Sequence, residues 1–297
     1  MFYEVHFLQH IALERRLAAH TVAAYREDLE SFLRYVKEQC LTSVSEVRHS
    51  HIRAWAAAQL QRGISARSVN RRLSCLKTYF KYLKVQGWIE QDPMRKLTSL
   101  KVGRRLPVFL SEAEVKVLLT DISFSPDYGG QLERMLLEIL YGVGLRSGEL
   151  IRLKVSDVDM SRMVLQVVGK GNRERAVPFA HYLADGLANF LRLRAKTFPN
   201  THEPWLFLSK KGEQLKPIFV YRVVHKYLSV VSAVEQRSPH VLRHTFATHL
   251  SNRGANLNAI KELLGHTSLA ATQIYTHNSI SRLIEVYQKA HPKGESQ

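Results

Sequence analysis

The sequence predicts a mainly α-helical protein that carries one small β-sheet. In the first hundred residues, apolar side chains recur at steps of three and four, the spacing of one helix face, and no strand is expected there. Residues 163–179 differ, because short valine-rich runs flank a glycine-rich turn as in a β-hairpin. Helical spacing returns in the second half of the chain near 131–141, 181–196, 217–231, 239–252 and 256–264.

The first region, residues 1–95, is expected to form a helical domain. One helix face is marked by Val22, Tyr25, Leu29, Phe32 and Val36. Ser50 and Ser65 are expected to cap two later helices, since serine side chains accept hydrogen bonds from free backbone N–H groups at helix starts. Gly63 and Gly87 are expected near the ends of these two helices.

A short basic stretch, residues 96–107, is expected to connect this region to a second domain at 108–297. Asp92-Pro93 closes the first domain, because this dipeptide favours a turn. The second domain begins with Ser111 and Glu114, whose spacing is that of a capping box.

The charge balance points to a polyanionic partner. The 297 residues include 43 Lys plus Arg against 26 Asp plus Glu, a formal net charge of +17. Both halves share the excess, and Val47–Ile89 contains nine basic residues and no acid. Charge alone leaves DNA, RNA and an anionic membrane open. No apolar run reaches the roughly 18 residues of a membrane span, and two cysteines cannot form a disulfide scaffold, so a reducing cytosol is expected.

The basic side chains of the first domain and the connector are candidates for phosphate contact. The faces of the helix after Ser65 carry no acid to balance them, although a merely solvated surface or a soluble linker is the alternative. The candidate DNA-binding residues are Arg67, Arg71, Arg72, Lys77, Lys101, Arg104 and Arg105.

Several other kinds of site are excluded by residue type and spacing. Ser147 stands where the third glycine of a dinucleotide-binding GxGxxG motif is needed, and Glu149 stands where a Walker A loop has lysine. His240 and His244 have the spacing of a zinc-binding helix, but Val241 replaces its glutamate and no carboxylate ligand lies nearby. The chain also lacks the convergent carboxylates of a two-metal nuclease. Neither a metal nor another cofactor is therefore expected.

A set of short motifs remains in the second domain. Ser238 and Pro239 are expected to start a helix on which His240 and Arg243 share one face, and the free N–H groups of such a first turn suit a phosphate. The stretches GLRSGEL, PHVLRHTFATHL and ELLGHTSLAATQIYTH resemble those of the tyrosine recombinases, most closely the bacterial Xer-type site-specific recombinases. The resemblance covers nearly the whole chain. It implies a helical, SAM-like N-terminal DNA-binding domain and a mostly helical catalytic domain with a small sheet.

The resemblance also assigns roles to individual residues. Tyr275 would attack a DNA phosphodiester to give a 3′-phosphotyrosyl link, while Arg146 and Arg243 would clamp the non-bridging oxygens. Lys170 would protonate the leaving 5′ oxygen and His240 would assist proton transfer at the tyrosine.

Two further residues complete the implied site. His266 would hydrogen-bond the phosphate, and Glu149 would support the site from the helix of Arg146. The ester energy stays in the phosphotyrosine, so rejoining needs no ATP.

The partners implied are double-stranded DNA with paired recombination sites and three further recombinase subunits. The tetramer is a homo-tetramer or a hetero-tetramer with a related recombinase, and the final helix of the chain docks on a neighbouring subunit or packs on its own domain. The protein is expected to lie in a bacterial cytoplasm at the nucleoid, without a membrane anchor, and a regulatory membrane or division-associated partner is compatible with this location.

The implied biological role is resolution of chromosome or plasmid dimers. Integration or inversion by a mobile element is the alternative within the same chemistry. A non-catalytic DNA-binding accessory protein and an enzyme that only relaxes supercoils are the alternatives outside strand exchange.

Overall fold

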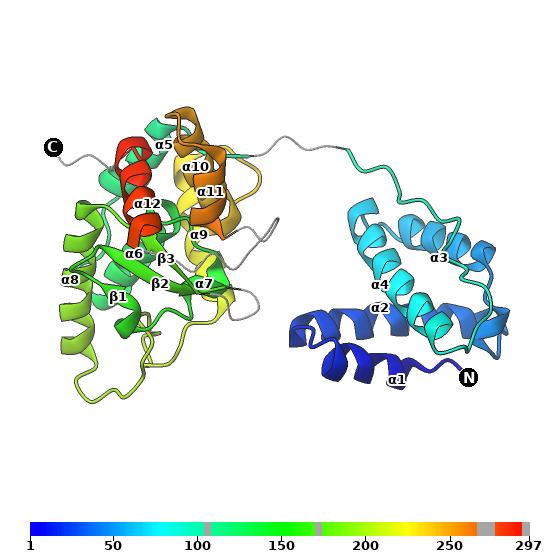
Figure 1. The fold of residues 1–297 in the computed structure, drawn as a ribbon. Coiled ribbons are helices and arrows are strands. Elements are labelled where there is room, and N and C mark those ends of the chain that lie inside the picture. Colours follow the sequence, from blue (N-terminus) through cyan, green and yellow to red (C-terminus); the bar gives the residue numbers. More distant parts are fainter. Residues whose placement is uncertain (104–107, 170–173, 266–276, 293–297) are drawn as a thin grey trace. The chain divides into compact units, whose positions relative to one another are not determined.

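The computed structural model describes residues 1–103, 108–169, 174–265 and 277–292, with only the backbone of 277–282 (Figure 1). The chain forms two compact units, Met1–Arg105 and Leu106–Gln297. The described residues confirm the predicted fold class, mainly α-helical with one small sheet.

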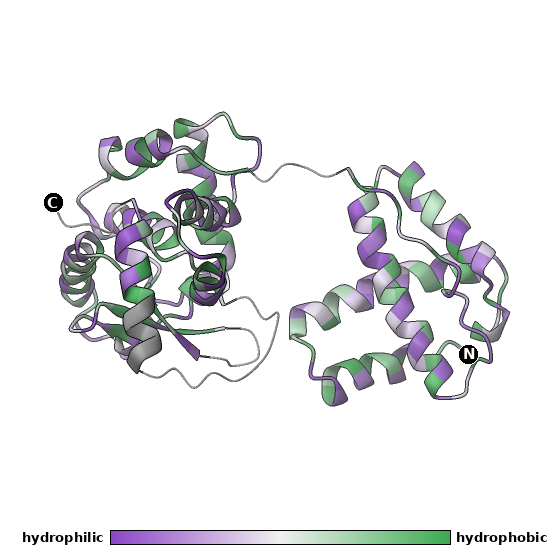
Figure 2. Cartoon of the chain, turned by 45° about the horizontal axis from the view of Figure 1, so that its top comes forward, coloured by the Kyte–Doolittle hydropathy of each residue, from purple (hydrophilic) through white to green (hydrophobic). Residues whose placement is uncertain are grey.

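The first unit is built from amphipathic helices. In the order of the chain they are α1 (Glu4–Gln9), which continues into a π-helical turn at His10–Glu14, α2 (Ala19–Glu38), α3 (His49–Gln61) and α4 (Ala66–Val85). Each longer helix has hydrophilic and hydrophobic residues on different sides (Figure 2). The hydrophobic sides meet in one core, where the Trp55 ring lies edge-on to Phe32 at 5.3 Å and Phe32 contacts Phe80.

The two predicted caps of this unit have different outcomes. Ser65 is the N-cap of α4, and its hydroxyl accepts a hydrogen bond from the N–H of Ser68, as predicted. Ser50 is not a cap, because α3 starts two residues earlier than predicted, at His49, with Arg48 as its N-cap. The His51 ring accepts the Arg48 N–H at 3.1 Å and takes over the capping function. The serine prediction was wrong because a histidine three residues after the cap supplied the acceptor.

The end of the first unit is fastened to α4. The Asn70 amide group donates to the carbonyl oxygen of Leu100 at 2.9 Å, and the Leu100 N–H donates back to the Asn70 side-chain oxygen at 2.8 Å. Leu97 and Leu100 also pack against the core of this unit. The first part of the predicted connector is therefore held against the helices.

The second unit contains eight α-helices and three strands among its described residues. In chain order these are α5 (Glu112–Lys116), α6 (Tyr128–Gly142), α7 (Ser147–Leu150), β1 (Val158–Asp159), β2 (Val164–Val168), β3 (Glu174–Pro178), α8 (His181–Thr197), α9 (Pro217–Val231), α10 (Pro239–Asn252), α11 (Leu257–Leu264) and α12 (His277–Ala290). The Ser111–Glu114 capping box at α5 is present as predicted.

The sheet is a three-stranded antiparallel meander in the order β1-β2-β3. The predicted hairpin corresponds to β2 and β3, which pair from Val164 with Pro178 to Val168 with Glu174. Strand β1 was missed because two residues carry too little alternation to be recognised. The predicted turn is Gly169–Asn172, and all of it but Gly169 lies outside the described residues.

Helix α6 lies at the centre of the second unit, with α8, α9 and α10 around it (Figure 1). Nearly all of its residues are buried, including both glycines at its start. Helix α12 packs on the same unit, against α10, α11 and β3. The Tyr287 hydroxyl, fully buried, donates to the carbonyl oxygen of Gly142 at 2.8 Å. In this structure the final helix thus covers its own domain. Within the described ranges, no helix is long and apolar enough to cross a membrane.

Candidate active site

The turn between α6 and α7 places Arg146 and Glu149 against each other. Gly144 adopts a φ of +68°, which lets the chain reverse between the two helices. Arg146 then occupies the N-cap of α7. Its backbone N–H and its Nη1 donate to the two carboxylate oxygens of Glu149 at 2.9 and 2.8 Å. The Arg146 side chain remains 37% exposed, so its guanidinium is both held and accessible.

Arg243 reaches the same place from α10. Its Nη1 donates to the Gly144 carbonyl oxygen at 2.7 Å, and its Nη2 donates to the Leu264 carbonyl oxygen at 2.6 Å. The side chain is buried, and its Nη1 lies 3.8 Å from the Glu149 carboxylate. These two donations use two of the five guanidinium N–H bonds and fix the plane of the group.

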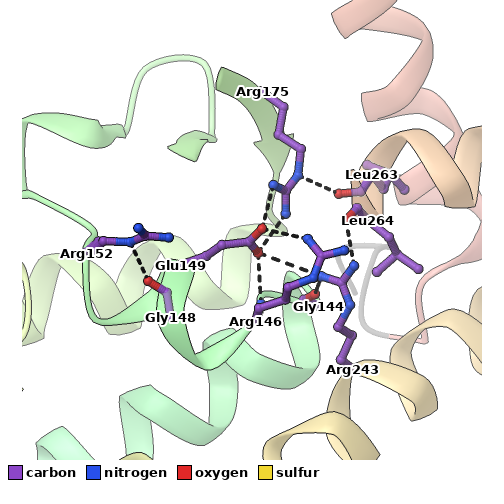
Figure 3. Close-up of polar contacts among 9 residues, drawn as sticks. All are labelled: Gly144, Arg146, Gly148, Glu149, Arg152, Arg175, Arg243, Leu263 and Leu264. Atoms are coloured by element: carbon purple, nitrogen blue, oxygen red, sulfur yellow. Dashed lines mark hydrogen bonds and ion pairs between the residues drawn. The ribbon is translucent and has the colours of Figure 1, made fainter. Parts of the chain in front are cut away.

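A third arginine, which the sequence did not single out, completes the cluster. Arg175 lies on β3 and is 5% exposed. Its Nη1 and Nη2 donate to the two oxygens of Glu149 at 3.0 and 2.9 Å, and its Nε donates to the Leu263 carbonyl oxygen at 3.1 Å (Figure 3). The cluster therefore joins β3, α7, α10 and the last turn of α11.

The charges of this cluster do not cancel. Three guanidinium groups surround one carboxylate, which leaves a formal charge of +2 in a largely buried position. Burial opposes ionisation of Glu149, but the hydrogen bonds and charge of Arg175, together with Arg146, lower its pKa to about 2. Burial, with the neighbouring Arg146 and Arg175, lowers the pKa of Arg243 to about 10, so the group stays charged at neutral pH. An anion such as a phosphate would neutralise the excess.

A hollow of about 350 Å³ opens beside this cluster. His240 and Arg243 both line it, as their spacing on α10 predicts, and Leu264 lines it from α11. Ser238 and Pro239 occupy the N-cap and first position of α10 as predicted, although the serine hydroxyl makes no capping bond. Two residues of the proposed chemistry thus face one cavity at a helix start.

Three predicted site residues lie outside the described residues: Lys170, His266 and Tyr275. The structure does describe the residues that lead up to Lys170 and His266. Val168 ends β2, and Gly265 caps α11 with a φ of +62° immediately before His266. The structure thus brings together Arg146, Glu149, His240 and Arg243 from the predicted set. Among the residues it describes, no group of three or more His, Cys, Asp or Glu could hold a metal ion.

The predicted DNA-binding residues of the first unit fall into two groups. Arg67, Lys77 and Lys101 are exposed, and none of them forms an ion pair within the described part of the chain. Arg71 and Arg72 are paired with an acid. Arg104 and Arg105 lie outside the described residues.

Asp28, on α2, balances two of these arginines. Its side chain is 2% exposed and accepts two hydrogen bonds from Arg71, at 2.5 and 2.8 Å. Burial raises the pKa of this carboxyl in spite of Arg71. Arg72 is half-buried, lies 3.7 Å from Asp28 and donates to the Gln59 side chain. The expectation that no acid balances these basic residues was therefore wrong for Arg71 and Arg72, because the acid comes from a different helix.

Comparison with known proteins identifies the family of this protein. Residues 109–282 match the model of the Phage integrase family, and residues 5–87 match the Phage integrase, N-terminal SAM-like domain. The chain is 38% identical to "Tyrosine recombinase XerC" of Thermodesulfovibrio yellowstonii, over 98% of this chain and 96% of that protein. It is 34% identical to the protein of the same name in Bacillus pumilus, over 97% and 95%.

Solved structures agree in fold. The XerH site-specific recombinase in its pre-cleavage complex with difH substrate is 26% identical, with a TM-score of 0.69 over 91% of this chain and 80% of that one. The Tn1549 transposon integrase bound to transposon right end DNA is 22% identical, with a TM-score of 0.70 over 95% and 93%. The chain therefore belongs to the phage integrase family, and its curated relatives are tyrosine recombinases.

Proposed function

We propose that the protein is a site-specific DNA recombinase, which cuts and rejoins duplex DNA through a tyrosyl-phosphate bond. The observation that carries this proposal is the arginine cluster, in which Arg146 and Arg243 meet at Glu149 with a surplus of positive charge and Arg243 also lines the adjoining cavity. The XerC-named relatives over nearly the full chain support it.

The nucleophile we propose is Tyr275. Its hydroxyl oxygen attacks the scissile phosphorus, the bond to the 5′ oxygen breaks, and a 3′-phosphotyrosyl link with a free 5′-hydroxyl results. Arg146 and Arg243 stabilise the negative charge that develops on the non-bridging oxygens, since guanidinium groups are permanently charged and suit phosphate geometry. Glu149 holds Arg146 in place, and the carbonyl oxygens of Gly144 and Leu264 hold Arg243.

In this proposal two other side chains transfer protons and a third hydrogen-bonds the phosphate. His240, which lines the cavity, assists removal of the proton from the Tyr275 hydroxyl. Lys170 gives a proton to the leaving 5′ oxygen, and His266 donates a hydrogen bond to the phosphate. The energy of the broken ester is kept in the phosphotyrosine, so attack by a 5′-hydroxyl from another strand reseals the DNA without ATP.

The substrate we propose is double-stranded DNA with two paired recombination sites, bound by four recombinase subunits. The tetramer is built from four copies of this chain, or from two copies and two of a related recombinase. Resolution of chromosome or plasmid dimers in the cytoplasm is the biological role, which the XerC-named relatives support. The solved XerH complex with its difH substrate supports the DNA partner.

A strand-exchange assay tests this function. Covalent adducts captured from fragmented host DNA first identify the cleavage site, and two duplexes of different length that carry the site are then mixed with the protein. Recombinant duplexes are expected. Adducts without recombinants would instead indicate an enzyme that only relaxes supercoils, and sequence-specific binding with no adduct would indicate an accessory protein.

A further inference from the structure

Arg175 occupies the point where the separate parts of the candidate site meet. We infer that Arg175 is a positioning residue for DNA cleavage. On one side it holds Glu149, and through it Arg146; on the other side it holds the end of α11, which precedes His266. This inference rests on the proposed function. It concerns a residue that touches neither the substrate nor the nucleophile in that proposal.

Arg146 and Arg175 share the Glu149 carboxylate. Arg175 gives one hydrogen bond to each carboxylate oxygen, and Arg146 gives another to each through its backbone and its side chain. The Glu149 carboxylate thus accepts four hydrogen bonds, its full complement for two oxygens. With Arg175 present, Glu149 fixes Arg146 but does not draw Arg243 into contact, since their closest distance is 3.8 Å.

Without Arg175, the balance of these charges changes. A buried carboxylate that loses a bidentate partner compensates through the cations that remain, because an unpaired buried charge is costly. The cations within reach are Arg146 and Arg243. Both would be drawn toward Glu149 and away from the phosphate, and the formal charge of the cluster would fall from +2 to +1.

Arg175 also contacts the end of α11. Two consecutive carbonyl oxygens of its last turn are capped by arginines, Leu263 by Arg175 and Leu264 by Arg243. Gly265 follows, and a Cβ atom on it would lie 3.0 Å from Nη1 and 3.1 Å from Cδ of Arg175. The glycine lets the chain pass directly over the guanidinium. The residue that follows it is His266, so Arg175 fixes the point from which that histidine begins.

A matched control exists in the same unit. Arg194, on α8, is also buried and donates its Nε and Nη2 to backbone carbonyl oxygens, of Trp205 and Glu203. Its hydrogen bonds go to these two carbonyl oxygens and not to Glu149 or α11. Arg194→Met therefore removes a buried arginine of similar structural importance without touching the candidate site.

The experiment measures the rate of covalent adduct formation at saturating DNA, in a single turnover, with a nicked duplex carrying the cleavage site. The rate is divided by the fraction of folded protein from circular dichroism at the same temperature. We expect Arg175→Met to slow the step about 100-fold, the usual scale for loss of a charge-stabilising group, with DNA affinity unchanged within about threefold. Arg194→Met is expected to match the wild-type rate per folded molecule.

A second variant separates positioning from simple stabilisation. In Arg175→Met, the further change Glu149→Gln removes the carboxylate that competes for Arg146 and Arg243, and the rate is expected to recover by about tenfold. Arg175→Lys, which keeps the charge but not the two parallel bonds, provides a second measurement if the methionine variant does not fold, and it too is expected to be slow.

Three results would overturn the inference: an Arg175 variant that reacts at the wild-type rate per folded molecule, equal slowing by Arg194→Met, or no recovery in the double variant. A wild-type protein that forms no adduct would instead reject the proposed function. The two failures are thus distinguishable.

Discussion

Arg243 Nη2 donates to the carbonyl oxygen of Leu264 at 2.6 Å, and this bond ties α10 to the last turn of α11. The two residues belong to separate sequence motifs, yet one guanidinium serves as a helix C-cap and as a wall of the cavity. Cations near helix C-termini are favourable because they satisfy free carbonyl groups. The same bond therefore stabilises the fold and orients a group of the candidate site.

The tight turn at Gly144, before Arg146, predicts that replacing this glycine by alanine lowers stability strongly. Gly144 has a φ of +68°, and an added Cβ would lie 2.5 Å from the Phe246 ring. We expect Gly144→Ala to lower the free energy of unfolding by about 3 kcal/mol, from backbone strain and overpacking together.

Two other glycines give matched controls for this measurement by urea unfolding. Gly254 has a φ of +82° and open space around its Cβ position, so Gly254→Ala should cost only the strain, about 1 kcal/mol. Gly148 has open space and no positive φ, so Gly148→Ala should be neutral within about 1 kcal/mol. Equal losses at all three positions would contradict the contact with Phe246.

The ionisation of Glu149 predicts a pH dependence of stability. Its folded-state pKa of about 2 lies below the ordinary value of 4.5, so it stabilises the fold above about pH 4.5, and this contribution is lost as the pH falls toward 2. The shift corresponds to about 3 kcal/mol. Between pH 5 and 2, the wild type should lose about that much more stability than Glu149→Gln, measured by hydrogen exchange of α6 and α10 amides. Parallel curves for the two proteins would contradict the assignment.

The exposed cations of α4 predict a graded salt dependence of DNA binding. Arg67→Gln and Lys77→Gln should each reduce the slope of log affinity against log salt concentration by about 0.9, since each removes one unpaired phosphate contact. Arg71→Gln should have a smaller effect, because Asp28 already offsets that charge. The slopes are obtained from binding isotherms at several potassium chloride concentrations. Arg192→Gln, at an exposed position on α8, serves as the control, and slopes that change equally in all four variants would reject this division.

Loss of the Asn70 side chain is expected to release the end of the first unit, around Leu100, from α4. Asn70→Ala removes both hydrogen bonds to Leu100, at a cost of about 1–2 kcal/mol. We expect faster tryptic cleavage after Lys96, followed by mass spectrometry of the fragments. Ser74→Ala is the control, since its hydroxyl bonds only to the backbone of its own helix. Unchanged cleavage in Asn70→Ala would show that apolar packing alone holds this segment.

Much of the fold could be predicted because its signals are local. Helix spacing and the caps at Ser65 and Ser111 are written within a few neighbouring residues, and the structure places helices there. Ser50 failed as a cap because Arg48 and His51 offered a competing local solution. A two-residue strand such as β1 leaves no pattern to read.

The contacts of the candidate site depended on tertiary pairing and could be predicted only in part. The motifs named Arg146, Glu149, His240 and Arg243, and the structure brings these residues to one place. Their actual partners, such as the Leu264 carbonyl, come from distant parts of the chain. The Asp28 pair with Arg71 was missed for the same reason, since 43 residues separate the two.

One signal for Arg175 was present in the sequence. Residues of a strand alternate in direction, so Arg175 shares a face of β3 with Val177, which is buried. A charged residue in that register needs a buried partner of opposite charge. The identity of this partner, Glu149, was not readable, because nothing in the sequence pairs β3 with α7.

The central claim is that Tyr275 becomes covalently joined to DNA, and mass spectrometry of the adduct tests it most directly. After reaction with the nicked duplex and digestion by nuclease and trypsin, the account predicts a nucleotide on the peptide that contains Tyr275 and on no other tyrosine peptide. Tyr275→Phe should bind the same DNA with unchanged affinity and form no adduct. An adduct on a different residue, or one that persists in Tyr275→Phe, would contradict the account.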